Sequence, residues 1–228
     1  MRLYWEAFLR LIYPATCGVC ASLLELAEAG ICRTCQARLE ILRFSPEEAA
    51  LSERFQNLDE GWAIYPYEPP VRDILTGIKF AGKRWLVRVF HRDIETLSGL
   101  VASENYYDAI IPIPMARRRF LEREFNQSEL IARWVWKKTG IPLRTNVLFK
   151  KYHTPSQGLL SQKERRINLR HVFQVRRPDE IKNRSFLLVD DIFTTGATAE
   201  EAARALKATG AKRVDLLTLA RTGRESEN

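Results

Sequence analysis

Two adjacent carboxylates in the C-terminal part of the chain have the setting of a sugar-phosphate site. Asp190 and Asp191 follow an apolar run at residues 187–189, which predicts a buried strand, and a helix is expected to begin near Ala199. Parallel α/β sheets bind ligands at the carboxyl ends of their strands, and backbone amides at a helix N-terminus bind phosphate. The pattern therefore predicts carboxylates that bind vicinal hydroxyls or Mg2+ beside a phosphate cup. A solvated acidic turn is the alternative.

This segment resembles the phosphoribosyl diphosphate (PRPP) binding motif of type I phosphoribosyltransferases. By that resemblance, Asp190 and Asp191 hold the ribose 2′- and 3′-hydroxyls of PRPP. Family members that recycle hypoxanthine or guanine carry an Asp at the position of Thr194, so their base-protonating carboxylate is missing here. The loop residues that the resemblance assigns to the 5′-phosphate are Thr194, Thr195, Gly196, Ala197 and Thr198.

An acidic pair at the end of a strand is also found in the Walker B element of ATPases, and residues 77–84 have the glycine and lysine spacing of a P-loop. However, Arg84 stands where a P-loop has Ser or Thr. A P-loop also follows a strand, whereas the residues upstream show the apolar periodicity of a helix, at Val71, Ile74, Leu75 and Ile78. We therefore expect a helix in this segment.

All four cysteines lie near the N-terminus, in two Cys-x-x-Cys pairs that are separated by 11 residues. Two such pairs complete a four-cysteine tetrahedral zinc site, formed here by Cys17, Cys20, Cys32 and Cys35. Disulfides are the alternative, but we expect no cleavable export signal and hence a reducing compartment, in which disulfides are rare. A redox-active pair would not need a second pair. We predict a structural zinc ion.

Length and composition fit one α/β domain with a small appendage in a chain of 228 residues. No apolar run reaches the roughly 18 residues that span a bilayer. Residues 1–13 mix charged and apolar residues as an amphipathic helix does, without a cleavage site, so a cytoplasmic location is expected. We expect a helix and zinc ribbon in residues 1–43, a connector in 44–60 and a phosphoribosyltransferase-like domain in 61–228.

Strands that alternate with helices predict a mostly parallel sheet flanked by helices, with right-handed crossovers. Residues 109–111 are expected to form a central strand. The other expected strands are residues 62–65, 147–149, 187–189 and 214–219, and the expected helices are residues 71–80, 85–97, 126–139 and 200–209.

The middle of the chain is strongly basic. Residues 117–177 contain 16 Lys or Arg against 4 Glu and no Asp, whereas the net charge of the whole chain is +8. A solvated basic face is the usual alternative to an anion site. Arg117, Arg118 and Arg119 follow the strand at residues 109–111, and an Arg-rich loop at a strand end can hold a diphosphate. Lys79 is expected to stabilise the same diphosphate.

The order of the motifs resembles that of ComF-type proteins, which pair a zinc ribbon with a phosphoribosyltransferase-like domain and are linked to DNA uptake in natural competence. One departure is Glu124, where the family usually has Gly; this carboxylate predicts weaker PRPP binding or a different backbone path. The motifs are the cysteine pairs and residues 112–114, 125–127, 157, 160–161, 165–168, 173 and 190–198.

Three functions remain open from the sequence. The first is Mg2+-dependent transfer of phosphoribose from PRPP to an acceptor that no residue pattern identifies, with residues 153–173 expected to form a loop that closes over the site. The second is a sensor that binds PRPP or a nucleotide without turnover. The third is an accessory factor of the competence machinery in which the ribbon and the basic middle bind single-stranded DNA.

Overall fold

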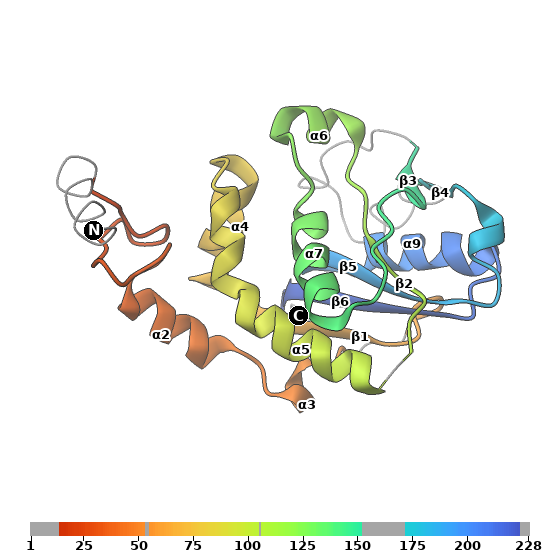
Figure 1. Ribbon diagram of the computed structural model, residues 1–228, viewed down its shortest axis with the longest axis horizontal. Coiled ribbons are helices and arrows are strands. Elements are labelled where there is room, and N and C mark those ends of the chain that lie inside the picture. Colours follow the sequence, from red (N-terminus) through yellow and green to blue (C-terminus); the bar gives the residue numbers. More distant parts are fainter. Residues whose placement is uncertain (1–13, 53–54, 105, 152–171, 224–228) are drawn as a thin grey trace, which may run out of the picture.

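The computed structural model describes residues 14–52, 55–104, 106–151 and 172–223 (Figure 1). The expected helix in residues 1–13 and nearly all of the expected loop at 153–173 lie outside the described residues. Phe173, the last residue of that loop, is buried in a short strand.

Four parallel strands form the main sheet, which confirms the expected fold class. Their order is β1 (Gly61–Pro66), β6 (Arg213–Arg221), β5 (Ser185–Phe193) and β2 (Ala109–Pro112). The expectation that residues 109–111 form a central strand is wrong, because β2 lies at an edge of this sheet. Its outer side makes only an isolated bridge, between Ile110 and Leu143, among the described residues.

Alternating side chains of the strands pack against helices on both faces of the sheet. Leu187 and Val189 of β5 belong to one buried cluster, and Phe186 and Leu188 belong to the other. A strand that is buried on both faces reads as a continuous apolar run, which is why the sequence predicted β5. The acidic pair nevertheless lies inside the strand, since β5 continues to Phe193.

One face of the sheet is covered by three helices, α4 (Val71–Phe80), α5 (His91–Glu104) and α7 (Gln127–Thr139) (Figure 1). The helix expected at residues 85–97 is divided in two: its first part lies in the 3-10 helix η1 (Arg84–Phe90), and residues 91–97 form the start of α5. Both segments have buried apolar residues at helical spacing, and apolar spacing alone does not distinguish the two helix types.

The other face is covered by α9 (Ala197–Ala208), which begins about two residues before the expected start. A separate antiparallel pair, β3 (Leu148–Lys150) and β4 (Phe173–Val175), lies beside α9, and the 3-10 helix η3 (Pro178–Glu180) follows it. Strand β3 is displaced by one residue from the expected 147–149.

The expected Arg-rich loop after β2 is a helix instead. Only residues 113–116 form the connection, and α6 (Arg117–Arg123) contains all three of the predicted arginines. In a helix, successive side chains point in different directions, so Arg117, Arg118 and Arg119 do not share one face.

The N-terminal segment packs on the side of the sheet that is covered by α4, α5 and α7. It contains α2 (Arg33–Leu42) and the short α3 (Pro46–Ala49), and its buried Cys17, Cys35 and Leu39 join the same hydrophobic cluster as α4, η1 and α5. The contact is close at Gly18, where an added Cβ atom would lie 2.5 Å from a methyl group of Leu86 in η1. Among the described helices, none is long and apolar enough to cross a membrane.

Candidate functional site

A cavity of about 230 Å³ lies at the carboxyl ends of β2 and β5. Residues 113–116 form one part of its lining, and the first residues of α7 form another. The predicted site residues that line it are Lys79, Arg119, Asp190, Asp191, Thr194 and Thr198. Arg117, Arg118, Thr195, Gly196 and Ala197 are nearby in the chain but are not part of the lining.

The acidic pair is held in a defined arrangement by its neighbours. Ser128 Oγ donates a hydrogen bond to Asp190 Oδ1 at 2.8 Å, and the backbone N–H of Asp191 donates to the same oxygen at 2.9 Å. Burial, and next the charge of Asp191, raise the pKa of Asp190 to about 7. The pair therefore holds a proton near neutral pH in the absence of further cations.

Lys79 supplies a positive charge to this pair from the last turn of α4. Its Nζ lies 2.7 Å from Asp191 Oδ2, and the two side chains are 20% and 14% exposed. The sequence predicted Lys79 as a site residue, and the structure brings it to the acidic pair. The same geometry removes the P-loop alternative, because Gly77 to Lys79 lie inside the helix.

A cationic wall, defined as Arg119, Arg123 and Lys150, lines the same cavity. Burial, and next the charge of Arg119, lower the pKa of both Arg123 and Lys150, so these groups are crowded by like charge and a bound anion would relieve them. Sequence reasoning missed Arg123 and Lys150. The i, i+4 spacing of Arg119 and Arg123 was the available signal, whereas Arg118 forms an exposed ion pair with Glu122.

The Thr/Gly loop connects β5 to the N-terminus of α9. Gly196 has φ +71°, in the left-handed region that favours glycine, and an added Cβ atom would lie 2.8 Å from the ring of Phe193. Thr195 Oγ1 accepts a bond of 3.4 Å from the backbone N–H of Ala197, whereas Thr194 and Thr198 face the cavity. Only glycine fits this turn without displacing the aromatic ring.

The first turn of α7 connects the loop after β2 to the acidic pair. Asn126 caps the helix by accepting from the N–H of Ser128 at 3.2 Å, and its Nδ2 donates to the carbonyl of Ile113 at 3.0 Å. Ser128 in turn binds Asp190. Asn126, Gln127 and Ser128 all line the cavity and were not predicted as site residues, although residues 125–127 were recognised as a family motif.

Glu124 ends α6 in the left-handed conformation, with φ +63°. This is a conformation that glycine adopts readily and that other residues adopt at a cost. The expected alternative backbone path is therefore not found: the chain makes the turn that suits a glycine, with a glutamate in place. The Glu124 side chain is exposed and is not part of the cavity lining.

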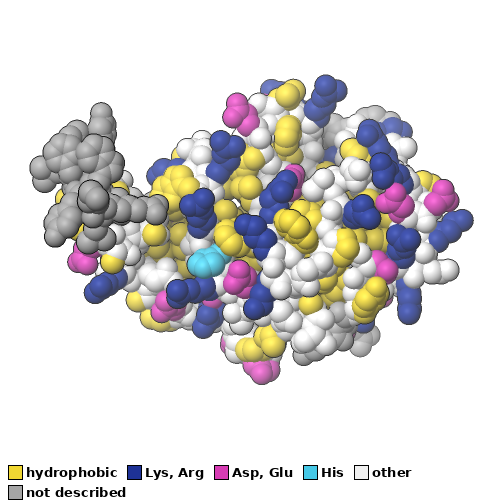
Figure 2. Space-filling model, in the orientation of Figure 1, with side chains coloured by type: hydrophobic (Ala, Val, Ile, Leu, Met, Phe, Trp, Pro, Cys, Tyr) yellow, Lys and Arg dark blue, Asp and Glu magenta, His cyan; other side chains and the backbone are white. Residues whose placement is uncertain are grey.

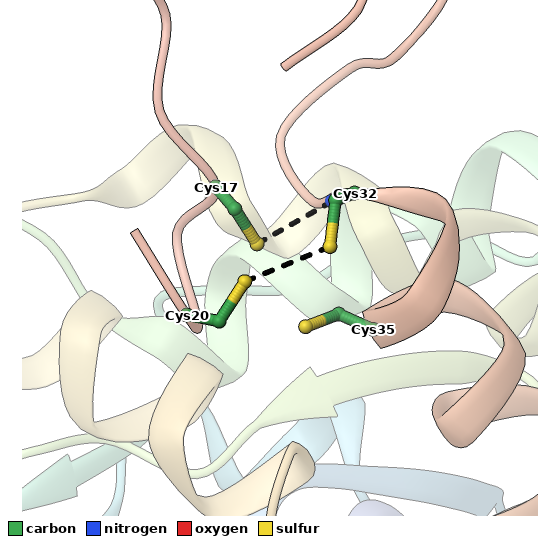
Figure 3. Close-up of side chains that lie close together, drawn as sticks. All are labelled: Cys17, Cys20, Cys32 and Cys35. Carbon is green, nitrogen blue, oxygen red and sulfur yellow. Dashed lines mark hydrogen bonds between the residues drawn. The ribbon is translucent and has the colours of Figure 1, made fainter. Parts of the chain in front are cut away.

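The four cysteines form a second candidate site, at the N-terminal end of the molecule (Figure 3). Their sulfur atoms all lie within 4.8 Å of one another, and Cys20 Sγ is 3.6 Å from Cys32 Sγ. A tetrahedral zinc ion with bonds of about 2.3 Å places sulfurs roughly 3.8 Å apart, so the four thiols fit zinc. No disulfide is formed among them.

Local hydrogen bonds favour the thiolate form that a metal requires. The backbone N–H groups of Cys32 and Val19 donate to Cys17 Sγ at 3.3 and 3.5 Å. Hydrogen bonds from the side chain and backbone of Ser22 lower the pKa of Cys20 to about 6, whereas burial raises the pKa of Cys35. A bound cation would stabilise the buried thiolate as well.

The fold is that expected of a phosphoribosyltransferase-like protein, and residues 128–228 match the family model of the phosphoribosyl transferase domain. The chain is also similar to competence proteins over most of its length. It is 27% identical to competence protein F of Haemophilus influenzae over 221 residues, 90% of this chain and 96% of that protein. It is 27% identical to competence protein ComFC of Bacillus subtilis over 225 residues, 96% and 89% of the two chains.

A third relative is the DNA utilization protein YhgH of Escherichia coli K12, with 26% identity over 228 residues, 93% of this chain and 99% of that protein. The resemblance to ComF-type proteins is therefore confirmed. The match to ComFC covers 96% of this chain, so it leaves out fewer residues than precede Cys17 and includes the cysteine-containing segment.

Proposed function

We propose that this protein binds PRPP together with Mg2+ and transfers phosphoribose to an acceptor. The observation that carries the proposal is the composition of one cavity, in which the acidic pair lies with Lys79 and the cationic wall. Carboxylates suit the sugar hydroxyls, and cations suit the diphosphate. The match to the phosphoribosyl transferase domain supports the same ligand.

Each part of the ligand has a set of residues with matching chemistry. In the proposal, Asp190 and Asp191 hold the ribose hydroxyls, and residues 194–198 at the N-terminus of α9 hold the 5′-phosphate. Lys79 and the cationic wall bind the diphosphate. Arg117 and Arg118, which were expected to share this role, start α6 outside the cavity lining, so we assign the role to Arg119, Arg123 and Lys150.

The acidic pair also fits Mg2+, which proteins bind through one or two carboxylates together with substrate phosphates. Bound there, the ion would neutralise charge on the diphosphate. In the transfer step, a nucleophilic atom of the acceptor would form a bond to ribose C1, while the bond between C1 and the diphosphate oxygen breaks and its electron pair leaves with the diphosphate. Lys79, Arg119 and Arg123, which line the cavity, would stabilise that negative charge.

Calorimetric titration with Mg-PRPP tests the assignment. Binding at millimolar concentration or tighter is expected, and it should raise the melting temperature. No interaction with PRPP or any other 5-phosphoribosyl ligand would show that the substrate assignment is wrong. Clear binding without diphosphate release, with any acceptor tried, would favour a sensor of PRPP over an enzyme.

A second candidate function is single-stranded DNA binding, supported by aromatic and basic side chains near the cavity. Arg123 lies over the ring of Phe80 at 5.1 Å, and Phe80 is 75% exposed. Figure 2 shows many Lys and Arg side chains on the face that carries α4 and α7. Exposed aromatic rings beside cations are typical of single-strand binding surfaces, and one relative is named a DNA utilization protein.

We also propose that the four-cysteine cluster binds one structural zinc ion. All four ligand positions would be filled by Cys17, Cys20, Cys32 and Cys35, so the ion would stabilise the N-terminal segment and take no part in the transfer. None of the four cysteines lines the cavity, which supports a structural and not a catalytic role for the ion.

A further inference from the structure

Gln127 carries a buried hydrogen-bond donor that has no partner among the residues described by the structure. Its side chain is 4% exposed and lines the cavity, and its Nε2 atom has no hydrogen-bond partner among the residues that the structure describes. Buried polar atoms in folded proteins almost always have partners, because an unpaired donor loses its hydrogen bonds to water. This donor therefore requires an explanation.

The neighbouring polar groups of this turn bond elsewhere, and none of them forms a hydrogen bond with Gln127 Nε2. Asn126 bonds to the N–H of Ser128 and to the carbonyl of Ile113, and Ser128 bonds to Asp190. Asp190 Oδ1 accepts two hydrogen bonds, from Ser128 Oγ and from the N–H of Asp191. Among residues 126–128, Gln127 thus combines a place in the cavity lining with a side-chain donor that has no partner among the described residues.

The position of Gln127 indicates which part of a ligand it would meet. It begins the 13-residue helix α7, and Asn126 ties this end of the helix to Ile113 in the connection after β2. The cationic wall shares the cavity with it. The helix N-terminus and the cations both favour negatively charged oxygen. The missing acceptor is therefore expected to be an anionic oxygen on the side of the cavity assigned to the diphosphate.

We infer that Gln127 is a specificity-determining residue whose Nε2 donates a hydrogen bond to a diphosphate oxygen of the ligand. The inference rests on the proposed function. A neutral donor adds direction to the charge of the cationic wall, because an amide hydrogen bond requires an oxygen atom at a defined place. Gln127 would in this way separate ligands that carry a diphosphate from phosphorylated sugars that lack one.

The test is Gln127→Met, which keeps the length of the side chain and removes the donor. Affinity for Mg-PRPP and for inorganic diphosphate with Mg2+ should fall about ten- to a hundred-fold, whereas affinity for ribose 5-phosphate should change less than about twofold. The melting temperature of the free protein should rise by about 2 to 4 °C, because the unpaired buried donor is gone. Opposite effects on stability and on binding distinguish a ligand contact from a packing role.

Two further variants keep the test decisive. Gln174→Met makes the same substitution at an exposed position of β4 and should leave all three affinities unchanged. Gln127→Glu preserves the shape if the Met variant fails to fold, and its carboxylate should weaken diphosphate binding while ribose 5-phosphate still binds.

Each outcome separates the inference from the function on which it rests. If the wild type binds PRPP and Gln127→Met binds it equally well, the ligand does not accept from this donor and the inference is overturned. If the variant lowers the melting temperature and weakens all three ligands alike, Gln127 is a packing residue. If the wild type binds none of the three probes, the proposed function itself fails and the inference fails with it.

Discussion

Lys79 Nζ lies 2.7 Å from Asp191 Oδ2, so the acidic pair of the candidate site is held by a cation of the protein itself. The two residues come from α4 and β5, which meet only in the folded chain. A bound Mg2+ ion would compete with Lys79 for Asp191, because both are cations that seek the same oxygen. Ligand binding is therefore expected to move Lys79 away from Asp191 and toward the diphosphate.

Replacing Lys79 by Met should remove both its ion pair with Asp191 and its expected contact with the diphosphate. Affinity for inorganic diphosphate should fall about tenfold, since a charge-assisted contact is lost, and the free energy of unfolding should fall by about 1 to 3 kcal/mol because Asp191 loses its partner. Calorimetry and thermal unfolding measure the two effects. Lys138→Met, at an exposed position of α7, is the matched control. Unchanged diphosphate affinity in Lys79→Met would remove Lys79 from the site.

The raised pKa of Asp190 predicts a pH dependence of binding. Because burial and the charge of Asp191 raise this pKa to about 7, the carboxyl must lose a proton before it can bind Mg2+ or accept from sugar hydroxyls. Affinity for Mg-PRPP should therefore rise as the pH increases through about 7 and then level off. Asp190→Asn should bind more weakly and lack this step. A step that persists in Asp190→Asn would belong to the ligand phosphates and not to Asp190.

The same pKa predicts a pH dependence of stability. A carboxyl whose pKa is raised from its usual 3.8 binds its proton more tightly in the folded state, so its contribution is fully present at low pH and is lost as the pH rises through about 7. Asp190→Asn is free of this loss. The difference in free energy of unfolding between Asp190→Asn and the wild type should therefore shift in favour of the variant by roughly 1 to 3 kcal/mol between about pH 5 and about pH 8.

The left-handed backbone conformation of Glu124 predicts that glycine at this position would stabilise the protein. Its φ of +63° costs a residue with a Cβ atom about 1 to 2 kcal/mol, of which part is offset because glycine loses more entropy on folding. Glu124→Gly should therefore raise the free energy of unfolding by about 0.5 to 1 kcal/mol. Glu122→Gly, two residues earlier inside α6, should lower it by a similar amount. A loss of stability in Glu124→Gly would mean that its side chain contributes more than its backbone costs.

The zinc prediction rests on four thiols that lie within 4.8 Å of one another. Elemental analysis should find about one zinc per chain, and a chelator should lower the melting temperature, because binding free energy is folding free energy at such sites. Cys32→Ser should lose the metal, whereas Ser22→Ala, beside Cys20, should keep it. PRPP binding should survive in Cys32→Ser, since no cysteine lines the cavity. Absence of metal, or a disulfide among the four, would contradict the prediction.

How much of the site the sequence could predict depends on the range of the interactions. The acidic pair and the glycine turn were predictable because local patterns determine them: the apolar run predicts β5, and Gly196 fits a left-handed turn. The fold class followed in the same way, from strands that alternate with helices. What the sequence could not show is that α6 replaces the expected loop, since its arginines suit either structure.

Local sequence patterns do not predict contacts between residues that are far apart in the chain. Lys150 enters the cavity from β3, and Ser128 reaches Asp190 from α7, neither of which a periodicity in the sequence indicates. The edge position of β2 is also a property of strand order, which residue type does not determine. For Arg123 the helical spacing from Arg119 was a signal, but it requires knowing that the segment is a helix.

The DNA-binding hypothesis gives a prediction that can be separated from PRPP binding. An oligothymidine should bind at low salt, and its affinity should fall steeply as salt rises, because released counterions supply most of the affinity. Arg123→Ala should weaken binding and lower the salt dependence by about one ion, and Phe80→Ala should weaken it by about 1 to 3 kcal/mol if a base stacks on the ring.

Arg184→Ala, at an exposed position next to the amino end of β5, removes the same charge away from the cavity and should change affinity little. Phe80 is exposed and lies outside the cavity lining, so Phe80→Ala should affect Mg-PRPP binding less than Arg123→Ala, which should weaken the binding of both ligands. Affinity that does not vary with salt, or equal losses from Arg184→Ala and Arg123→Ala, would mean that the aromatic and basic rim of the cavity is not the DNA-binding surface.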